Sequence, residues 1–156
     1  MREKCVKKHA ARKSAGFAFV VAIILGGGCG SASAQGSAPG PFAPDQVDAG
    51  RKGFAENCAE CHGKDLSGGT APVLAGPEFV GRWKEKNTAE LYKFIQTTMP
   101  MCQGGVLGNR AYADIVAFVL WANGAQPGPD DFDGKAQASI SAIASGTVRP
   151  DLSKTR

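Results

Sequence analysis

The chain has 156 residues, of which 43% are hydrophobic, and its formal net charge is +4. Residues 1–34 hold six of the 18 Lys and Arg side chains but only one of the 14 Asp and Glu side chains. The remainder therefore carries 12 basic and 13 acidic residues, a net charge of −1, which excludes the basic surface expected of a nucleic-acid-binding protein.

Residues 1–34 have the pattern of a secretory signal peptide. A basic start is followed by an apolar run over 17–25 and by small residues that end at Ala34. This order predicts export, with cleavage after Ala34. The apolar run is short for a bilayer span, so we expect no stable membrane insertion after cleavage. A lipid anchor at Cys29 is the alternative, which Gly26 disfavours because lipoprotein signals prefer Leu three residues before the cysteine.

The exported part has the length of one domain. Residues 35–44 are rich in Gly, Pro, Ser and Ala, which predicts a flexible lead-in. Asp45 is a candidate N-cap for a first helix, whose apolar face is spaced like that of a helix: Val47, Gly50, Phe54 and Cys58. Gly50 costs helix propensity, so we expect another helix to approach closely there.

The first helix runs into the sequence Cys58-Ala59-Glu60-Cys61-His62. Two cysteines at this spacing, followed directly by a histidine, are typical of c-type haem attachment. A thioredoxin-like redox pair would need a βαβ setting, and a zinc site would need a second ligand pair; neither is evident. The motif therefore predicts one covalent haem c, with its iron bound by His62, the only histidine after the signal peptide.

Short segments follow the motif. Residues 63–76 contain many glycines and prolines, which predicts a loop along one side of the haem. Phe79 and Trp83 are four residues apart, as in a helix that lines the pocket. A further helix begins after Asn87, with Glu90 completing a capping box, and its apolar residues are Leu91, Phe94 and Ile95.

Pro100 ends that helix near Thr97 or Thr98, because it forces Met99 into an extended conformation. Cys102 then makes the cysteine count of the exported chain odd, which indicates a silent thiol or an intermolecular disulfide. Residues 103–108 form a glycine-rich loop.

Asn109 is the predicted cap of the last helix, which ends at Asn123-Gly124 and is apolar nearly all round. Its buried stripe is Tyr112, Ile115, Val116, Val119 and Leu120. The composition then shifts to Pro, Gly, Asp, Ser and Ala, so residues 125–156 are predicted to be a mobile tail with at most one or two weak amphipathic turns.

Four features together resemble a small monohaem class I cytochrome c, of the bacterial periplasmic type associated with quinoprotein dehydrogenases. They are the haem motif, the preceding Gly50-x-x-x-Phe54-x-x-x-Cys58, the sequence Thr98-Met99-Pro100, and the segment 112–118. The resemblance covers residues 45–124. It implies an all-α fold of helices and loops wrapped around one covalently bound haem, in which the last helix crosses the first, so that Gly50 lies against residues 115–118.

The resemblance also implies roles for single residues. His62 and Met99 would be the two axial ligands of the iron, with Met101, or no sulfur at all, as the alternatives to Met99. The carbonyl group of Pro72 would accept a hydrogen bond from the other ring nitrogen of His62, although a plain turn proline is an equal alternative. The indole N–H of Trp83 would donate to a haem propionate, unless that side chain only packs in the core.

These ligands imply a periplasmic carrier of single electrons in a respiratory chain, and not an enzyme, because an iron with both axial positions filled favours outer-sphere electron transfer. The partners implied are a quinoprotein (alcohol) dehydrogenase as donor and a terminal oxidase or another cytochrome as acceptor. Two alternatives remain open: a haem subunit of a dehydrogenase complex, and a haem sensor or catalyst with an open sixth site.

Overall fold

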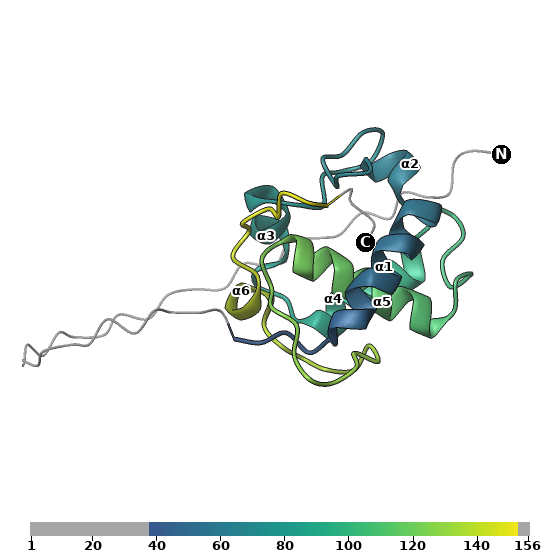
Figure 1. Cartoon of the computed structure of the whole chain (residues 1–156). Helices are drawn as coiled ribbons and strands as arrows, with labels where there is room; N and C mark the ends of the chain where they lie inside the picture. The colour runs from purple at the N-terminus through teal and green to yellow at the C-terminus, as the bar shows by residue number, and fades with distance from the viewer. Residues whose placement is uncertain (1–37, 153–156) are drawn as a thin grey trace, which may run out of the picture. The chain divides into compact units, whose positions relative to one another are not determined.

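The computed structural model describes residues 38–152 and shows an all-α arrangement (Figure 1). Its helices are α1 (Pro44–Asn57), α2 (Ala59–His62), α3 (Pro77–Trp83), α4 (Thr88–Thr98), α5 (Asn109–Ala122) and α6 (Ile140–Ile143). This part of the chain forms no strand, only two isolated bridges, and none of its helices has the length and apolar character needed to cross a membrane. The all-α prediction is therefore confirmed. The predicted signal peptide, its cleavage site and Cys29 lie outside the described residues.

Helices α1 and α5 form the central packed pair, and Gly50 lies where they come closest. A Cβ atom at this position would overlap the backbone carbonyl oxygen of Asp114. The expected approach of the later helix is therefore present, centred on Asp114 and Ile115, at the edge of the predicted 115–118 turn. Only glycine allows two helix backbones to come this close.

Helix α1 begins two residues before the start that an N-cap at Asp45 would give. Pro44 occupies its first turn, where a missing N–H costs nothing, and the preceding residue Ala43 is the N-cap instead of Asp45. The backbone N–H of Ala43 donates to Oε1 of Gln46 at 3.3 Å. A buried glutamine thus takes over part of the capping that the sequence suggested for Asp45.

Helix α4 has the predicted capping box: Glu90 N–H donates to Asn87 Oδ1 at 2.9 Å, and Asn87 N–H donates to Glu90 Oε2 at 3.0 Å. The helix ends at Thr98, and Met99 follows in an extended conformation, as Pro100 requires. Phe94 differs from the prediction, because its side chain is 47% exposed instead of lying in the buried face with Leu91.

Helix α5 starts at Asn109, but Gly108 is the N-cap, so Asn109 is the first helical residue and not the cap. The predicted stripe is buried, and so are its neighbours in almost every direction: Ala113, Ala117, Phe118 and Ala122. Asn123 and Gly124 end the helix as predicted, with Gly124 at φ 94°.

Residues 38–44 and 125–152, on either side of 45–124, are packed, which corrects the expectation of a flexible lead-in and a mobile tail for these described parts. Phe42 is fully buried, and residue 39 pairs with residue 126. After α5 the chain runs back over the helices, and α6 lies against α3 (Figure 1). The larger buried apolar side chains of this returning segment are Phe132, Ile140, Ile143 and Leu152.

Long-range hydrogen bonds explain why these low-complexity segments pack. The buried side chain of Gln46 donates to Asp114 Oδ1 at 2.8 Å and to the carbonyl oxygen of Phe132 at 3.0 Å, and its Oε1 accepts from the N–H of Phe132 at 2.6 Å. The N–H of Thr88 donates to the carbonyl of Ala138 at 3.0 Å. These contacts join residues far apart in sequence, so local composition does not predict them.

Candidate haem-binding site

The Cys58–His62 motif lies at the junction of α1 and the single-turn helix α2. The N–H of Cys58 still bonds to Phe54 in α1 at 2.8 Å, and the N–H of His62 bonds to the carbonyl of Cys58 at 3.0 Å. This turn keeps the two cysteines and the histidine together. Cys58 is half-buried, Cys61 is exposed, and His62 is only 8% exposed.

The two thiols of the motif do not form a disulfide with each other in the structure. Burial, and to a smaller extent the neighbouring Cys61, raises the pKa of the Cys58 thiol to about 11. A thiol–disulfide oxidoreductase needs the opposite, a cysteine whose pKa is lowered so that the thiolate forms near neutral pH. The environment of Cys58 therefore disfavours the thioredoxin-like alternative.

The loop 63–76 folds back onto the motif through backbone hydrogen bonds. The N–H of Gly68 donates to the carbonyl of His62 at 2.9 Å, and the N–H of Ala71 donates to the carbonyl of Cys61 at 3.1 Å. The base of the loop is closed by a bond from the N–H of Leu74 to the carbonyl of Leu66 at 2.9 Å. The glycine-rich segment after the motif is thus an ordered loop beside His62.

This loop brings Pro72 to the predicted place: its carbonyl oxygen lies 2.7 Å from Nδ1 of His62. A carbonyl oxygen can only accept a hydrogen bond, so Nδ1 must carry the proton. In the neutral ring this leaves the lone pair on Nε2, the nitrogen that can bind a metal ion. Within residues 38–152 no protein group forms a hydrogen bond with Nε2.

The two candidate methionine ligands differ in burial. Met99 directly follows α4 and is half-buried, whereas Met101 is 71% exposed. The hydroxyl group of Tyr112 donates to the carbonyl of Met99 at 2.7 Å and accepts from the N–H of Gly105 at 3.0 Å. This buried tyrosine therefore holds both ends of the 99–105 segment. Its position in α5 was predicted from helical periodicity, but its hydrogen bonds were not.

Trp83, whose indole N–H was predicted to contact a haem propionate, lies at the end of α3. Its ring packs against those of Phe79 and Phe94, with centroids 6.4 and 5.3 Å away. Its indole N–H has no protein acceptor within the described part of the chain. That donor is therefore available to a bound carboxylate, but the ring packing alone fits a core role equally well.

Asn123 is a residue whose role the sequence did not reveal. Its side chain is fully buried at the end of α5 and reaches the loop beside His62. Oδ1 accepts from the N–H of Gly76 at 2.8 Å, and Nδ2 donates to the carbonyls of Leu74 at 2.9 Å and Val119 at 2.8 Å. The Asn-Gly pair signalled a helix end, but nothing local showed that the side chain turns inward.

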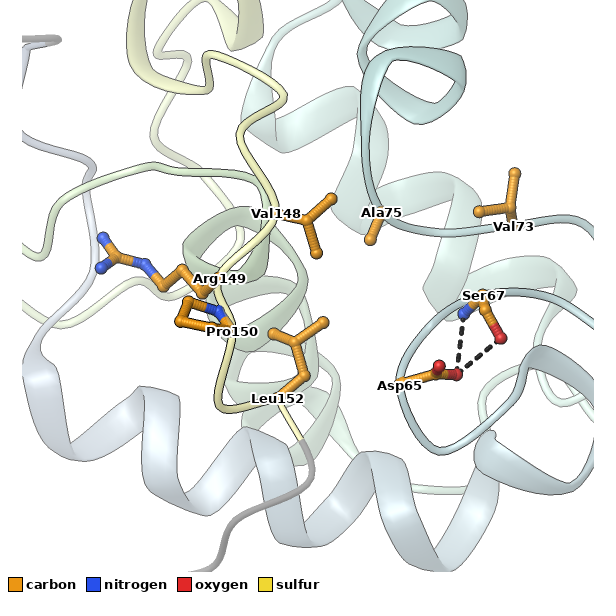
Figure 2. Close-up of a pocket in the computed structure, with 8 residues that line it drawn as sticks. All are labelled: Asp65, Ser67, Val73, Ala75, Val148, Arg149, Pro150 and Leu152. Carbon is orange, nitrogen blue, oxygen red and sulfur yellow. Dashed lines mark hydrogen bonds between the residues drawn. The ribbon is translucent and has the colours of Figure 1, made fainter.

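A pocket of about 430 Å³ lies beside the same loop (Figure 2). It separates the loop from the end of the returning segment and is lined by Asp65, Ser67, Val73, Ala75, Val148, Arg149, Pro150 and Leu152. The guanidinium group of Arg149 points away from it, and Nε donates to the carbonyl of Trp121 at 2.8 Å. None of the predicted haem-site residues lines this pocket.

The described residues contain no group of three or more His, Cys, Asp and Glu side chains close enough to hold a metal ion. A zinc site of the usual four-ligand kind is therefore not built around Cys58 and Cys61. A haem requires less of the protein, because the porphyrin supplies four of the iron ligands and the chain needs to add only axial groups and thioether bonds. The residues around His62 fit this second requirement.

Comparison with known proteins agrees with this geometry. Residues 45–119 match the family model described as cytochrome C oxidase, cbb3-type, subunit III. No match was found among curated proteins or solved structures. The matched region starts in α1 and ends within α5, so it contains the motif, the loop with Pro72 and the segment with Met99. The match and the helical fold support a class I c-type cytochrome domain, with haem c as its cofactor and electron transfer as its function.

Proposed function

We propose that this chain is an exported periplasmic electron carrier with one haem c, attached through Cys58 and Cys61 and ligated by His62 and Met99. When bound, the haem supplies a one-electron couple between ferric and ferrous iron. The observation that carries the proposal is the 2.7 Å contact between Nδ1 of His62 and the carbonyl of Pro72. It fixes the histidine as the tautomer that a metal ligand needs.

The burial of the motif supports the same role. His62 is shielded from water, so its ring is constrained, while exposed Cys61 and half-buried Cys58 remain accessible to chemistry at the vinyl groups of a porphyrin. Trp83 offers an indole N–H with no protein acceptor in the described residues, which suits a propionate group.

Met99 is the better candidate for the second axial ligand. Its backbone is extended and its carbonyl is fixed by Tyr112, so its position is defined, whereas Met101 is largely in solvent. With both axial positions filled by side chains, the domain would bind no substrate at the iron and would carry electrons without acting as an enzyme. A quinoprotein dehydrogenase is the proposed donor, and a terminal oxidase or another cytochrome the proposed acceptor.

The description of the matched family favours one second candidate, a haem-bearing subunit of an oxidase complex. Such a subunit would remain bound to its partner during purification. The proposed carrier exchanges partners through small, transient contacts and is expected to elute alone.

The ferric spectrum and carbon monoxide binding test the proposal together. We expect a low-spin ferric form with a sulfur-to-iron charge-transfer band, a one-electron redox titration, and slow carbon monoxide binding limited by loss of the methionine. Immediate carbon monoxide binding to the reduced protein, with no charge-transfer band, would instead show an open sixth site and favour a sensor or catalyst.

A further inference from the structure

We propose that Asn123 is a positioning residue for the axial histidine: it fixes the end of the loop that carries Pro72, and through Pro72 it sets the hydrogen bond donated by His62. The inference rests on the proposed role of His62 as an iron ligand. Neither the haem motif nor the family resemblance assigns a role to Asn123.

The first step is the burial and bonding of the amide. Asn123 is fully buried, and its three side-chain hydrogen bonds, all between 2.8 and 2.9 Å, use both the oxygen and the nitrogen. Two of them reach across to the loop, at the N–H of Gly76 and the carbonyl of Leu74. The third returns to Val119 in α5, so the amide joins the loop to the most buried helix of the domain.

The second step is the short path from Asn123 to His62. Leu74 is two residues from Pro72, and its own N–H bonds to Leu66 on the opposite side of the loop. The Pro72 carbonyl therefore lies between two fixed points, the Leu74 contacts and the His62 ring. Gly63, Gly68 and Gly76 all have positive φ and give this loop little stiffness of its own. Its shape therefore depends on the hydrogen bonds that hold it, across its base, to the motif and to Asn123.

The third step is the effect on the ligand. Replacing Asn123 by an apolar residue leaves the N–H of Gly76 and the carbonyl of Leu74 buried without these partners, which favours a shifted loop that regains hydrogen bonds elsewhere. A shift at Leu74 moves the Pro72 carbonyl and weakens its bond to Nδ1. The ring then becomes a poorer electron donor to the iron, because the accepted hydrogen bond normally strengthens it. A poorer donor stabilises the ferric state less, so the reduction potential should rise.

The test compares Asn123→Leu with Gln46→Met in the haem-loaded protein. Both changes replace a fully buried amide by an apolar side chain of similar volume. Gln46 makes four hydrogen bonds, to Ala43, Asp114 and Phe132, and none to the loop. The readouts are the hydrogen-exchange rate of His62 Nδ1–H by NMR of the reduced protein, and the reduction potential.

We expect Asn123→Leu to speed Nδ1–H exchange roughly fivefold or more and to raise the potential, because a net hydrogen bond is commonly worth about a factor of five in an equilibrium. Gln46→Met should lower the melting temperature but leave both readouts at the wild-type values. Equal changes in the two variants would reduce Asn123 to a structural residue, and no change in Asn123→Leu would overturn the inference.

If Asn123→Leu does not accumulate, Asn123→Asp provides the second variant. Aspartate keeps an acceptor for the N–H of Gly76 but loses the N–H donors to Leu74 and Val119, so exchange should be faster than in the wild-type protein. A wild-type exchange rate in Asn123→Asp would overturn the inference. A wild-type chain that carries no covalent haem would overturn the proposed function itself, which makes the two failures distinguishable.

Discussion

The two ends of α5 serve the two sides of the candidate haem site in different ways. Near its start, Tyr112 holds the segment with Met99 through a single hydroxyl group. At its end, the fully buried amide of Asn123 holds the loop with Pro72 through two hydrogen bonds, and a third anchors that amide to Val119 in α5. The end regions of one helix therefore position both proposed ligands, and the histidine side is held more firmly because its loop also bonds back to the motif at His62 and Cys61. We expect the methionine side to open first when the protein is stressed.

The largest effect should come from breaking the helix pair that places both ends of α5. Gly50→Ala puts a methyl group onto the carbonyl oxygen of Asp114, and a backbone atom cannot rotate away. Overpacking of this kind costs about 1–3 kcal/mol, and more where the backbone must move. We expect a fall in the free energy of unfolding, measured by denaturant titration, together with loosening at both Met99 and Pro72.

Two glycines in other positions provide the controls. A Cβ at Gly53, also in α1, would meet only the end of the Ile115 side chain at 3.3 Å, and a Cβ at Gly81, in α3, would meet nothing within 4 Å. Gly81→Ala should stabilise the protein by up to about 1 kcal/mol through helix propensity. If Gly50→Ala behaves like Gly81→Ala, the close approach of α1 and α5 is absent in solution.

The next effect isolates the methionine side. Met99→Leu keeps the apolar volume nearly constant, so the fold should tolerate it while the iron loses its sulfur ligand. We expect loss of the charge-transfer band, a lower potential and rapid carbon monoxide binding. Met101→Leu, in an exposed position, should change none of these. The reverse pattern would make Met101 the ligand instead of Met99. No change in either variant would contradict methionine ligation and favour the alternative of an open sixth site.

A smaller change tests how Met99 is held. Tyr112→Phe removes the hydroxyl that bonds to the carbonyl of Met99 and the N–H of Gly105, at a cost of about 1–3 kcal/mol for the groups left behind. Imidazole should then displace the methionine from the ferric iron roughly tenfold faster. Tyr92→Phe is the matched control, since its hydroxyl contacts Asn109 and Gln96 instead. Equal rates in both variants would contradict the proposed role of Tyr112.

The smallest effect concerns partner binding. Charges of both signs alternate along α3 and α4, with ion pairs between Arg82 and Glu78 at 3.3 Å and between Lys86 and Glu90 at 2.9 Å. Such a surface gives no strong field of one sign, so the second-order rate with a quinoprotein dehydrogenase should change by less than about tenfold between low and physiological salt. A fall of several orders of magnitude would require a focused charged patch.

Features with local causes could be predicted from the sequence. The capping box at Asn87, the extended Met99 before Pro100 and the apolar periodicity of α5 depend on residues a few positions apart. The close approach at Gly50 was also predictable, because glycine lowers helix stability and its place on the apolar face of a helix indicates a close contact with another helix. The haem motif is local as well, so the candidate site could be proposed without a structure.

Features with distant causes could not be predicted. The tail from residue 125 has the composition of a mobile segment, yet Ile140 and Leu152 are buried. Helix α6 packs against α3, and the Arg51 side chain in α1 donates to the carbonyl of Leu152 at 2.6 Å. The inward turn of Asn123 likewise depends on a loop 47 residues earlier. Periodicity and turn chemistry carry no information on such partners.

The mass of the purified protein after denaturation tests the central claim most directly. Covalent haem survives denaturation, so the account predicts a mass equal to the chain from Gln35 plus one haem, with the added mass located on the peptide that contains Cys58 and Cys61. Replacing either cysteine by alanine should leave at most one thioether bond. A mass equal to the polypeptide alone, with Cys58 and Cys61 as thiols or joined as a disulfide, would contradict the account.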